Sequence, residues 1–184
     1  MKFNQHFDLK GRHSFLSASQ NSWVNYTDEK LDARYLTAMA AQRGTALHEL
    51  AQQAITLGVK LPRNKNTLNQ YVNDAIGFRM KPEQVLFYSP NAFGTADSIS
   101  FRNDFLRIHD LKTGTTPTHM TQLKVYEAFF CLEYSYKPSE IEAELRIYQD
   151  NDYVVERPDS EEIVYIMDKI INFDKRINAI KELQ

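Results

Sequence analysis

Two short segments in the middle of the chain, residues 94–101 and 105–111, constrain the fold more than any other feature. Both have the pattern of β-strands, and the polar turn between them predicts a β-hairpin. A two-residue turn at 103–104 pairs Asp97 with Asp110 across the hairpin, and a four-residue turn would give the same register. The sequence therefore predicts a sheet in which two carboxylates face each other.

These two carboxylates share one face of the hairpin with Lys112, because side chains alternate along a strand. Directly opposed like charges destabilise a sheet, and a divalent cation such as Mg²⁺ would offset that repulsion. Lys112 adds a positive charge that could orient or activate a water and stabilise charge on a phosphate. Gly94 and Gly114 would allow close backbone approach. The alternative is that Asp97 and Asp110 are surface carboxylates that form salt bridges with Lys112 and make no functional site.

The other elements follow from hydrophobic periodicity. Helices are expected over 31–41, over 45–57, from about Thr67, beyond Pro117 through Phe130, and from 159 or 160 toward the end; strands are expected over 85–88, 141–147 and 153–156. Thr27 is the expected N-cap of the first helix, and Gly58 is expected to end the second. Residues 141–147 alternate between apolar and polar, which indicates a half-buried strand. In the last helix, apolar residues from Ile163 to Ile180 form a stripe. This order predicts an α/β domain with a mixed sheet.

Length and composition favour one globular domain over 1–184, with a helical part at about 16–80 and a catalytic part at about 83–184. Apolar residues make up 42% and charged residues 25%, so a soluble protein is expected. Apolar runs fall far short of the roughly 20 residues needed to cross a bilayer, and the start of the chain lacks a secretory pattern. A cytoplasmic protein without a membrane partner is therefore expected.

Cys131 is the single cysteine, which excludes an internal disulfide, a cysteine zinc site and an iron-sulfur cluster held within one chain. Its aromatic neighbours predict a packed core thiol. The formal net charge is −2, so the chain is not a strongly basic nucleic-acid coat. Nucleic-acid binding would then depend on a local basic patch and on bound cations.

Four motifs lie in order along the chain: Leu-Ser-Ala-Ser at 16–19, Gly-Thr-Ala-Leu-His-Glu at 44–49, Gly-x-x-Asp at 94–97 followed by Asp-x-Lys-Thr-Gly at 110–114, and Gln-x-x-x-Tyr at 122–126. Together they resemble the RecB-like nucleases of the PD-(D/E)XK superfamily. The motif at 94–114 is similar to the family signature, and residues 44–49 resemble its upstream histidine helix. Residues 122–126 resemble its Gln-x-x-x-Tyr motif, and residues 16–19 resemble its serine-rich start. The resemblance implies a restriction-endonuclease-like domain with a central mixed sheet flanked by helices.

The resemblance also implies a site that binds one or two Mg²⁺ or Mn²⁺ ions. The implied metal ligands are the side chains of His48, Asp97 and Asp110 and the backbone carbonyl of Leu111. Lys112 would be the catalytic lysine. The alternative is that His48 is an ordinary helix residue beside an apolar stripe.

Three further positions complete the implied site. Gln122 and Tyr126 would line it and contact nucleic acid or orient the lysine, although residues four apart on a helix could also be ordinary packing neighbours. Glu83 resembles a commonly acidic position of the family. Many relatives hold an iron-sulfur cluster, which this chain cannot, and no P-loop is present, so an unwinding motor would be a separate chain.

The implied function is a free-standing, phage-type DNA exonuclease that acts in recombination, repair or phage DNA processing. Its partners would be DNA and a recombinase, helicase or single-strand-binding protein, in a bacterial or phage-infected cytoplasm. The alternative is a nucleic-acid or protein-binding module that keeps the fold without cleavage.

Overall fold

The computed structural model describes residues 3–114 and 118–183. The chain divides into two compact units, residues 1–43 and 44–184, and the boundary falls inside helix α1 (Asp28–Leu57). The sheet and the other long helices belong to the second unit. The single nuclease domain expected over 1–184 stays a prediction.

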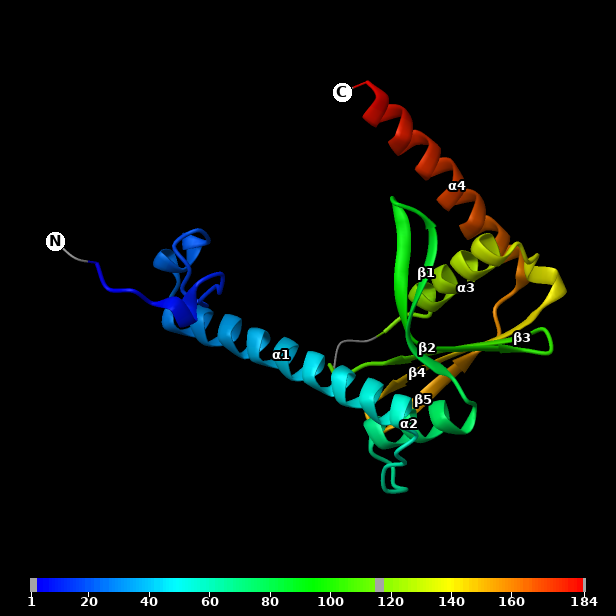
Figure 1. Ribbon diagram of the computed structural model, residues 1–184, viewed down its shortest axis with the longest axis horizontal. Coiled ribbons are helices and arrows are strands. Elements are labelled where there is room, and N and C mark those ends of the chain that lie inside the picture. The colour runs from blue at the N-terminus through cyan, green and yellow to red at the C-terminus, as the bar shows by residue number, and fades with distance from the viewer. Residues whose placement is uncertain (1–2, 115–117, 184) are drawn as a thin grey trace. The chain divides into compact units, whose positions relative to one another are not determined.

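The first unit contains two short 3₁₀ helices, η1 (Phe7–Leu9) and η2 (Asn21–Asn25), and the first half of α1 (Figure 1). The backbone N–H of Lys30 donates to Thr27 Oγ1 at 3.3 Å, so the predicted N-cap is confirmed.

Helix α1 corrects the prediction of two separate helices over 31–41 and 45–57, because the structure continues through the intervening residues. Gly44 inside a helix costs only about 1 kcal/mol relative to alanine, which neighbouring turns can offset. The helix ends where expected. Gly58 has φ of +69°, and the N–H of Val59 donates to the carbonyl of Ala54 at 2.9 Å.

A five-stranded sheet with the order β1-β2-β3-β4-β5 forms the centre of the second unit (Figure 1). Its strands are β1 (Lys81–Ser89), β2 (Ala92–Arg102), β3 (Phe105–Leu111), β4 (Glu142–Gln149) and β5 (Asp152–Glu156). Only β3 and β4 run parallel; the other neighbours are antiparallel. The predicted α/β class with a mixed sheet is therefore confirmed.

The hairpin between β2 and β3 has the predicted register. The pairs run from Ser98 with His109 to Arg102 with Phe105. The two turn residues at 103–104 both have positive φ, as a two-residue type I′ turn requires. Asp97 and Asp110 lie one step beyond the pair of Ser98 with His109, at the end away from the turn.

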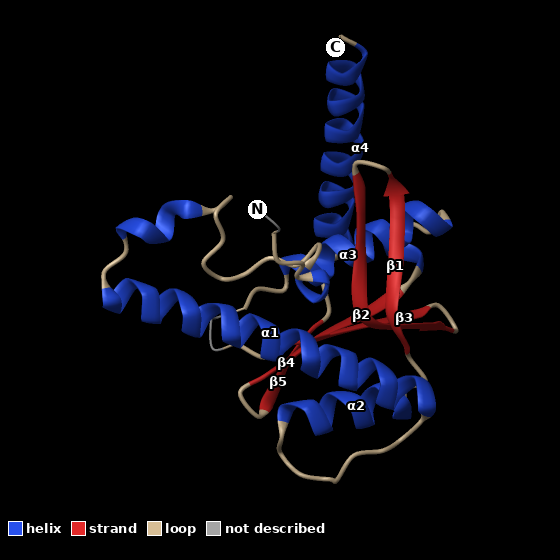
Figure 2. Cartoon of the chain, turned by 60° about the vertical axis from the view of Figure 1, so that its left-hand side comes forward, coloured by secondary structure: helices blue, strands red, loops and turns tan. Residues whose placement is uncertain are grey.

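Helices cover both faces of the sheet (Figures 1 and 2). On one face α3 (Thr121–Tyr134) packs on a core that includes Leu106, Ile108, Leu123 and Phe129. On the other face α2 (Thr67–Gly77) and the end of α1 pack on a second core that includes Ala54, Val72, Leu111 and Tyr148. Pro117, which precedes α3 in the sequence, lies outside the described residues. Cys131 is buried in the first core, as predicted.

Strand β4 is buried on both faces, which corrects the prediction of a half-buried strand. Glu144 and Tyr148, expected on the solvent side, are 9% and 0% exposed. The Tyr148 hydroxyl donates to Asp74 Oδ2 at 2.7 Å, and Arg146 donates to both Asp74 and Glu144. The alternation of apolar and polar residues in β4 is as predicted, but the polar residues pack under α2 instead of facing water.

Helix α4 (Ser160–Glu182) buries only the first part of its apolar stripe. Ile163 is fully buried, whereas Ile177 and Ile180 are 38% and 47% exposed. Asp174, in its second half, accepts a hydrogen bond from Asn91 in the turn between β1 and β2 at 2.8 Å. Within the described part of the chain, the helices are too short or too polar to span a lipid bilayer.

Candidate metal and catalytic site

Strands β1 and β2 bend together at one point, and the candidate site lies there. Ala96 and Ile99 both pack in the core under α3, although strict alternation would place residues three apart on opposite faces. On β1 the register pairs Pro82 with Ser98 and then Gln84 with Ala96. The skipped residue, Glu83, has φ of +50°, an uncommon conformation for a residue other than glycine. Such irregularities often re-aim side chains at functional sites.

Asp97 lies level with Glu83 at this bend, and its carboxylate points to the end of β3. The backbone N–H of Leu111 donates to Asp97 Oδ2 at 2.8 Å, and His48 Nδ1 lies 3.4 Å from the same oxygen. Burial and the negative charge of Asp110 raise the pKa of Asp97 to about 6, against the opposing effects of Leu111 N–H and His48. The repulsion expected between the two aspartates is therefore one cause of the raised pKa of Asp97.

Three side chains at the bend could hold a cation together. One ligand atom each from His48, Glu83 and Asp97 lies within 4.8 Å of the others, in a search of the described residues. Glu83, expected only from a loose resemblance, thus joins two of the predicted ligands. Asp110 is outside this group, and the role of the Leu111 carbonyl stays a prediction.

The chemistry of these donors fits Mn²⁺ and, with waters completing the shell, Mg²⁺. Carboxylate oxygens are the preferred protein ligands of both ions. Asp110 Oδ2 is buried and forms an ion pair with Lys112 Nζ at 2.9 Å, with no hydrogen bond among the described residues. It is a candidate oxygen donor for a metal ion bound at the site.

A chain of hydrogen bonds joins the predicted lysine to α3. Lys112 Nζ donates to Asp110 Oδ1 at 3.1 Å and to Gln122 Oε1 at 2.9 Å. Gln122 Nε2 in turn donates to the Tyr126 hydroxyl at 3.0 Å. The backbone N–H of Lys112 donates to the Tyr148 carbonyl at 2.9 Å, which fixes its position beside β4. The structure therefore brings Asp110, Lys112, Gln122 and Tyr126 together in one hydrogen-bonded chain, and their roles stay predictions.

The motif glycines explain how closely these elements approach. A Cβ on Gly94 would lie 2.8 Å from Tyr126 Cε1, so only glycine leaves room for the tyrosine ring. A Cβ on Gly44 would lie 2.8 Å from Thr113 Oγ1. Gly114 differs from expectation, because a Cβ there would meet no described atom within 4 Å.

Comparison with family models, with curated proteins and with solved structures gives no match. The fold class rests on the structure, and the resemblance to the RecB-like nucleases rests on the motifs and remains a prediction.

Proposed function

We propose that the chain is a metal-dependent nuclease of the PD-(D/E)XK type that hydrolyses phosphodiester bonds in DNA. One observation carries the proposal. At the bend of β1 and β2, the ligand group of His48, Glu83 and Asp97 lies next to the pair formed by Asp110 and Lys112. Two acidic side chains for a cation beside one lysine are the parts that phosphodiester hydrolysis needs.

Metal binding would fall to His48, Glu83 and Asp97, with the Asp110 carboxylate, ion-paired to Lys112, beside them. Bound Mg²⁺ or Mn²⁺ supplies Lewis-acid stabilisation of phosphate oxygens and lowers the pKa of a water. His48 Nδ1 lies 3.4 Å from Asp97 Oδ2, so that the neutral imidazole and the carboxylate can face one cation.

Lys112 would stabilise the negative charge that develops on the phosphate during attack. Its ammonium group has three donors, of which Asp110 and Gln122 take two, so one remains for a phosphate oxygen. The two partners fix the position of the ammonium group before substrate binds. Fixed donors aimed at developing charge are usually a large part of catalysis.

Gln122 and Tyr126 act as positioning residues in this proposal. The side-chain amide of Gln122 connects Lys112 to the hydroxyl of Tyr126. Burial raises the pKa of Tyr126, so its hydroxyl keeps its proton at neutral pH and can donate to DNA. The contact with Gly94 fixes the ring.

The test is incubation of the purified protein with end-labelled linear DNA and with covalently closed circular DNA, in Mg²⁺, Mn²⁺ or EDTA. We expect cleavage of linear DNA with either ion and none in EDTA. Loss of closed circles would identify internal cutting, and their survival would identify an exonuclease. Absence of cleavage with both ions, while DNA still binds, would favour the binding module that keeps the fold without catalysis.

A further inference from the structure

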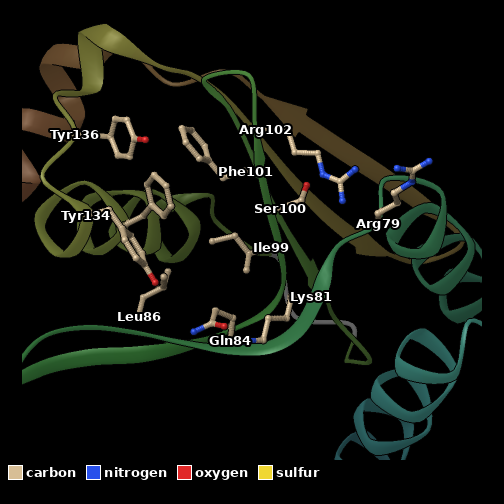
Figure 3. Close-up of a pocket in the computed structure, with 11 residues that line it drawn as sticks. Arg79, Lys81, Gln84, Leu86, Ile99, Ser100, Phe101, Arg102, Tyr134 and Tyr136 are labelled. Atoms are coloured by element: carbon tan, nitrogen blue, oxygen red, sulfur yellow. The ribbon is translucent and has the colours of Figure 1, made fainter.

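A cavity of about 400 Å³ lies beside the candidate site, between the β1–β2 pair and the end of α3 (Figure 3). Its floor contains the apolar residues Leu86 and Ile99. Figure 3 shows the polar and aromatic lining separated: the basic side chains of Arg79, Lys81 and Arg102 lie toward one end, and the rings of Phe101, Tyr134 and Tyr136 toward the other. The volume is within the range of small-molecule sites.

The basic end of the cavity carries three exposed cations without an acidic neighbour in the described part of the chain. Among the described residues, no carboxylate lies within ion-pair distance of Arg79, Lys81 or Arg102, and no acidic side chain lines the cavity. Arg79 also occupies the left-handed position that ends α2, with φ of +53°. Glycine is the usual residue there. Three unpaired cations at one end of a hollow favour an anionic ligand.

The aromatic end of the cavity is preorganised. Tyr136 stacks on Phe130 with an interplanar angle of 10° and contacts Phe101 at a centroid distance of 4.9 Å. Tyr134 also contacts Phe130 and is 49% exposed. The wall is held by packing, and Tyr134 still presents surface to a ligand. Exposed aromatic rings of this kind stack on unpaired bases.

The cavity and the candidate site share strands β1 and β2. Lys81 is two residues before Glu83 on β1, and Ile99 is two residues after Asp97 on β2. Two residues of a strand span about 7 Å. The two places are close enough along these strands for neighbouring parts of one polynucleotide to occupy both.

We infer that this cavity binds one nucleotide of single-stranded DNA, with a phosphate at Arg79, Lys81 and Arg102 and the base against Tyr134. The inference rests on the proposed function for the choice of DNA. The base is expected to be unpaired, because a base in a duplex must first be unpaired and unstacked to enter the hollow, whereas a single strand avoids most of that cost. The pocket would hold the strand while the neighbouring phosphodiester bond lies at the metal ligands.

The first measurement is fluorescence anisotropy of a labelled oligothymidylate in EDTA, where cleavage cannot interfere. The double variant Arg79→Ala, Arg102→Ala should bind roughly tenfold more weakly, and its salt slope should fall by about 1.4, the value for two lost phosphate contacts on a single strand. The control Lys175→Ala, Arg176→Ala makes the same charge change at exposed positions of α4. Equal losses in both double variants, or no loss in the first, would overturn the inference.

The second measurement separates the base from the phosphate. Tyr134→Ala should weaken binding of the single strand by about fivefold or more and leave binding of a blunt duplex unchanged, and Tyr134→Phe should restore single-strand binding. Equal effects on single strand and duplex would contradict a base-stacking role. Thermal melts of each variant show whether it is folded.

Cleavage of the same oligonucleotide in Mn²⁺ distinguishes this inference from the proposed function. If the wild type cleaves and the Arg79 and Arg102 variant binds as the wild type does, the nucleotide pocket is wrong and the nuclease stands. If the wild type does not cleave and binding still depends on the two arginines and Tyr134, the pocket stands and the nuclease is wrong.

Discussion

Glu127, in the middle of α3, is a carboxylic acid that the fold buries almost completely. Its surface is 3% exposed, and its Oε2 has no hydrogen-bond partner among the described residues. Burial, opposed in part by the charge of Lys124, raises the pKa of Glu127 to about 8 from a usual value of 4.5. The same helix carries Gln122 and Tyr126, so the packing around Glu127 also holds two residues of the candidate site.

The raised pKa makes ionisation of Glu127 oppose folding. Because the folded state binds this proton more tightly, the penalty is absent below pH 4.5, grows as the pH rises toward 8, and is constant above it. One pKa unit corresponds to about 1.4 kcal/mol, so the penalty reaches about 3 kcal/mol at pH 7. Glu127→Gln is neutral at every pH and should recover about 2 to 3 kcal/mol there.

Thermal melts of the wild type and Glu127→Gln across this pH range test the prediction. Each kcal/mol moves the midpoint of a chain of this size by roughly 2 to 4 °C, so the variant should melt about 5 to 10 °C higher at pH 7. The two proteins should melt together near pH 4.5. Glu182→Gln makes the same charge change at an exposed position and should show no such difference. A difference between wild type and Glu127→Gln that does not change with pH would refute the reasoning.

Three further predictions concern the metal site. Asp97→Asn should melt no lower than wild type in EDTA, since it removes repulsion with Asp110. Saturating Mn²⁺ should raise the melting midpoint of the wild type by about 5 to 10 °C and that of the variant hardly at all. An equal rise in both proteins would exclude Asp97 as a main ligand. His48→Ala should slow cleavage and raise the Mn²⁺ concentration for half-maximal rate, whereas an unchanged titration curve would make His48 an ordinary helix residue. Ca²⁺ should support DNA binding with little cleavage, because its looser coordination does not hold octahedral geometry; hydrolysis as fast as in Mg²⁺ would contradict this.

The hairpin that carries the aspartates could be predicted from the sequence because its register depends on local chemistry. A two-residue turn at 103–104 leaves one antiparallel pairing for β2 and β3, and the pairs found are those predicted. The same local logic located Thr27 and Gly58 at the two ends of α1. The partners of Lys112 on α3 were suggested by the motif order, since no local rule connects them.

The position of Glu83 in the ligand group could not be predicted, because it depends on a break in the alternation of side chains along β1 and β2. Its positive φ and the matching bend at Asp97 let Ala96 and Ile99 share one core. A rule of strict alternation cannot find such a point. The burial of both faces of β4 was missed for a related reason, because its cover comes from α2, more than sixty positions away in the sequence.

The surroundings of the two aspartates are more than the like-charge repulsion expected from the hairpin. Asp110 forms an ion pair with Lys112, and Asp97 accepts a hydrogen bond from the backbone N–H of Leu111. The sequence alone does not predict the cavity beside the site. Its lining comes from separate elements, including Arg79 after α2 and Tyr134 at the end of α3, and only the folded chain brings them together.

The most direct test of the account is the single-turnover rate of DNA cleavage as a function of Mn²⁺ concentration, for wild type, Asp97→Asn and Lys112→Ala. The exposed variant Lys175→Ala is the matched control for loss of a lysine. We expect Lys112→Ala to lower the rate at saturating Mn²⁺ by roughly a hundredfold or more, with the half-saturating concentration unchanged. Asp97→Asn should show no saturation in the wild-type range, and Lys175→Ala should match wild type. Wild-type protein that fails to cleave DNA in Mn²⁺, or Lys112→Ala that cleaves as fast as wild type, would contradict the account.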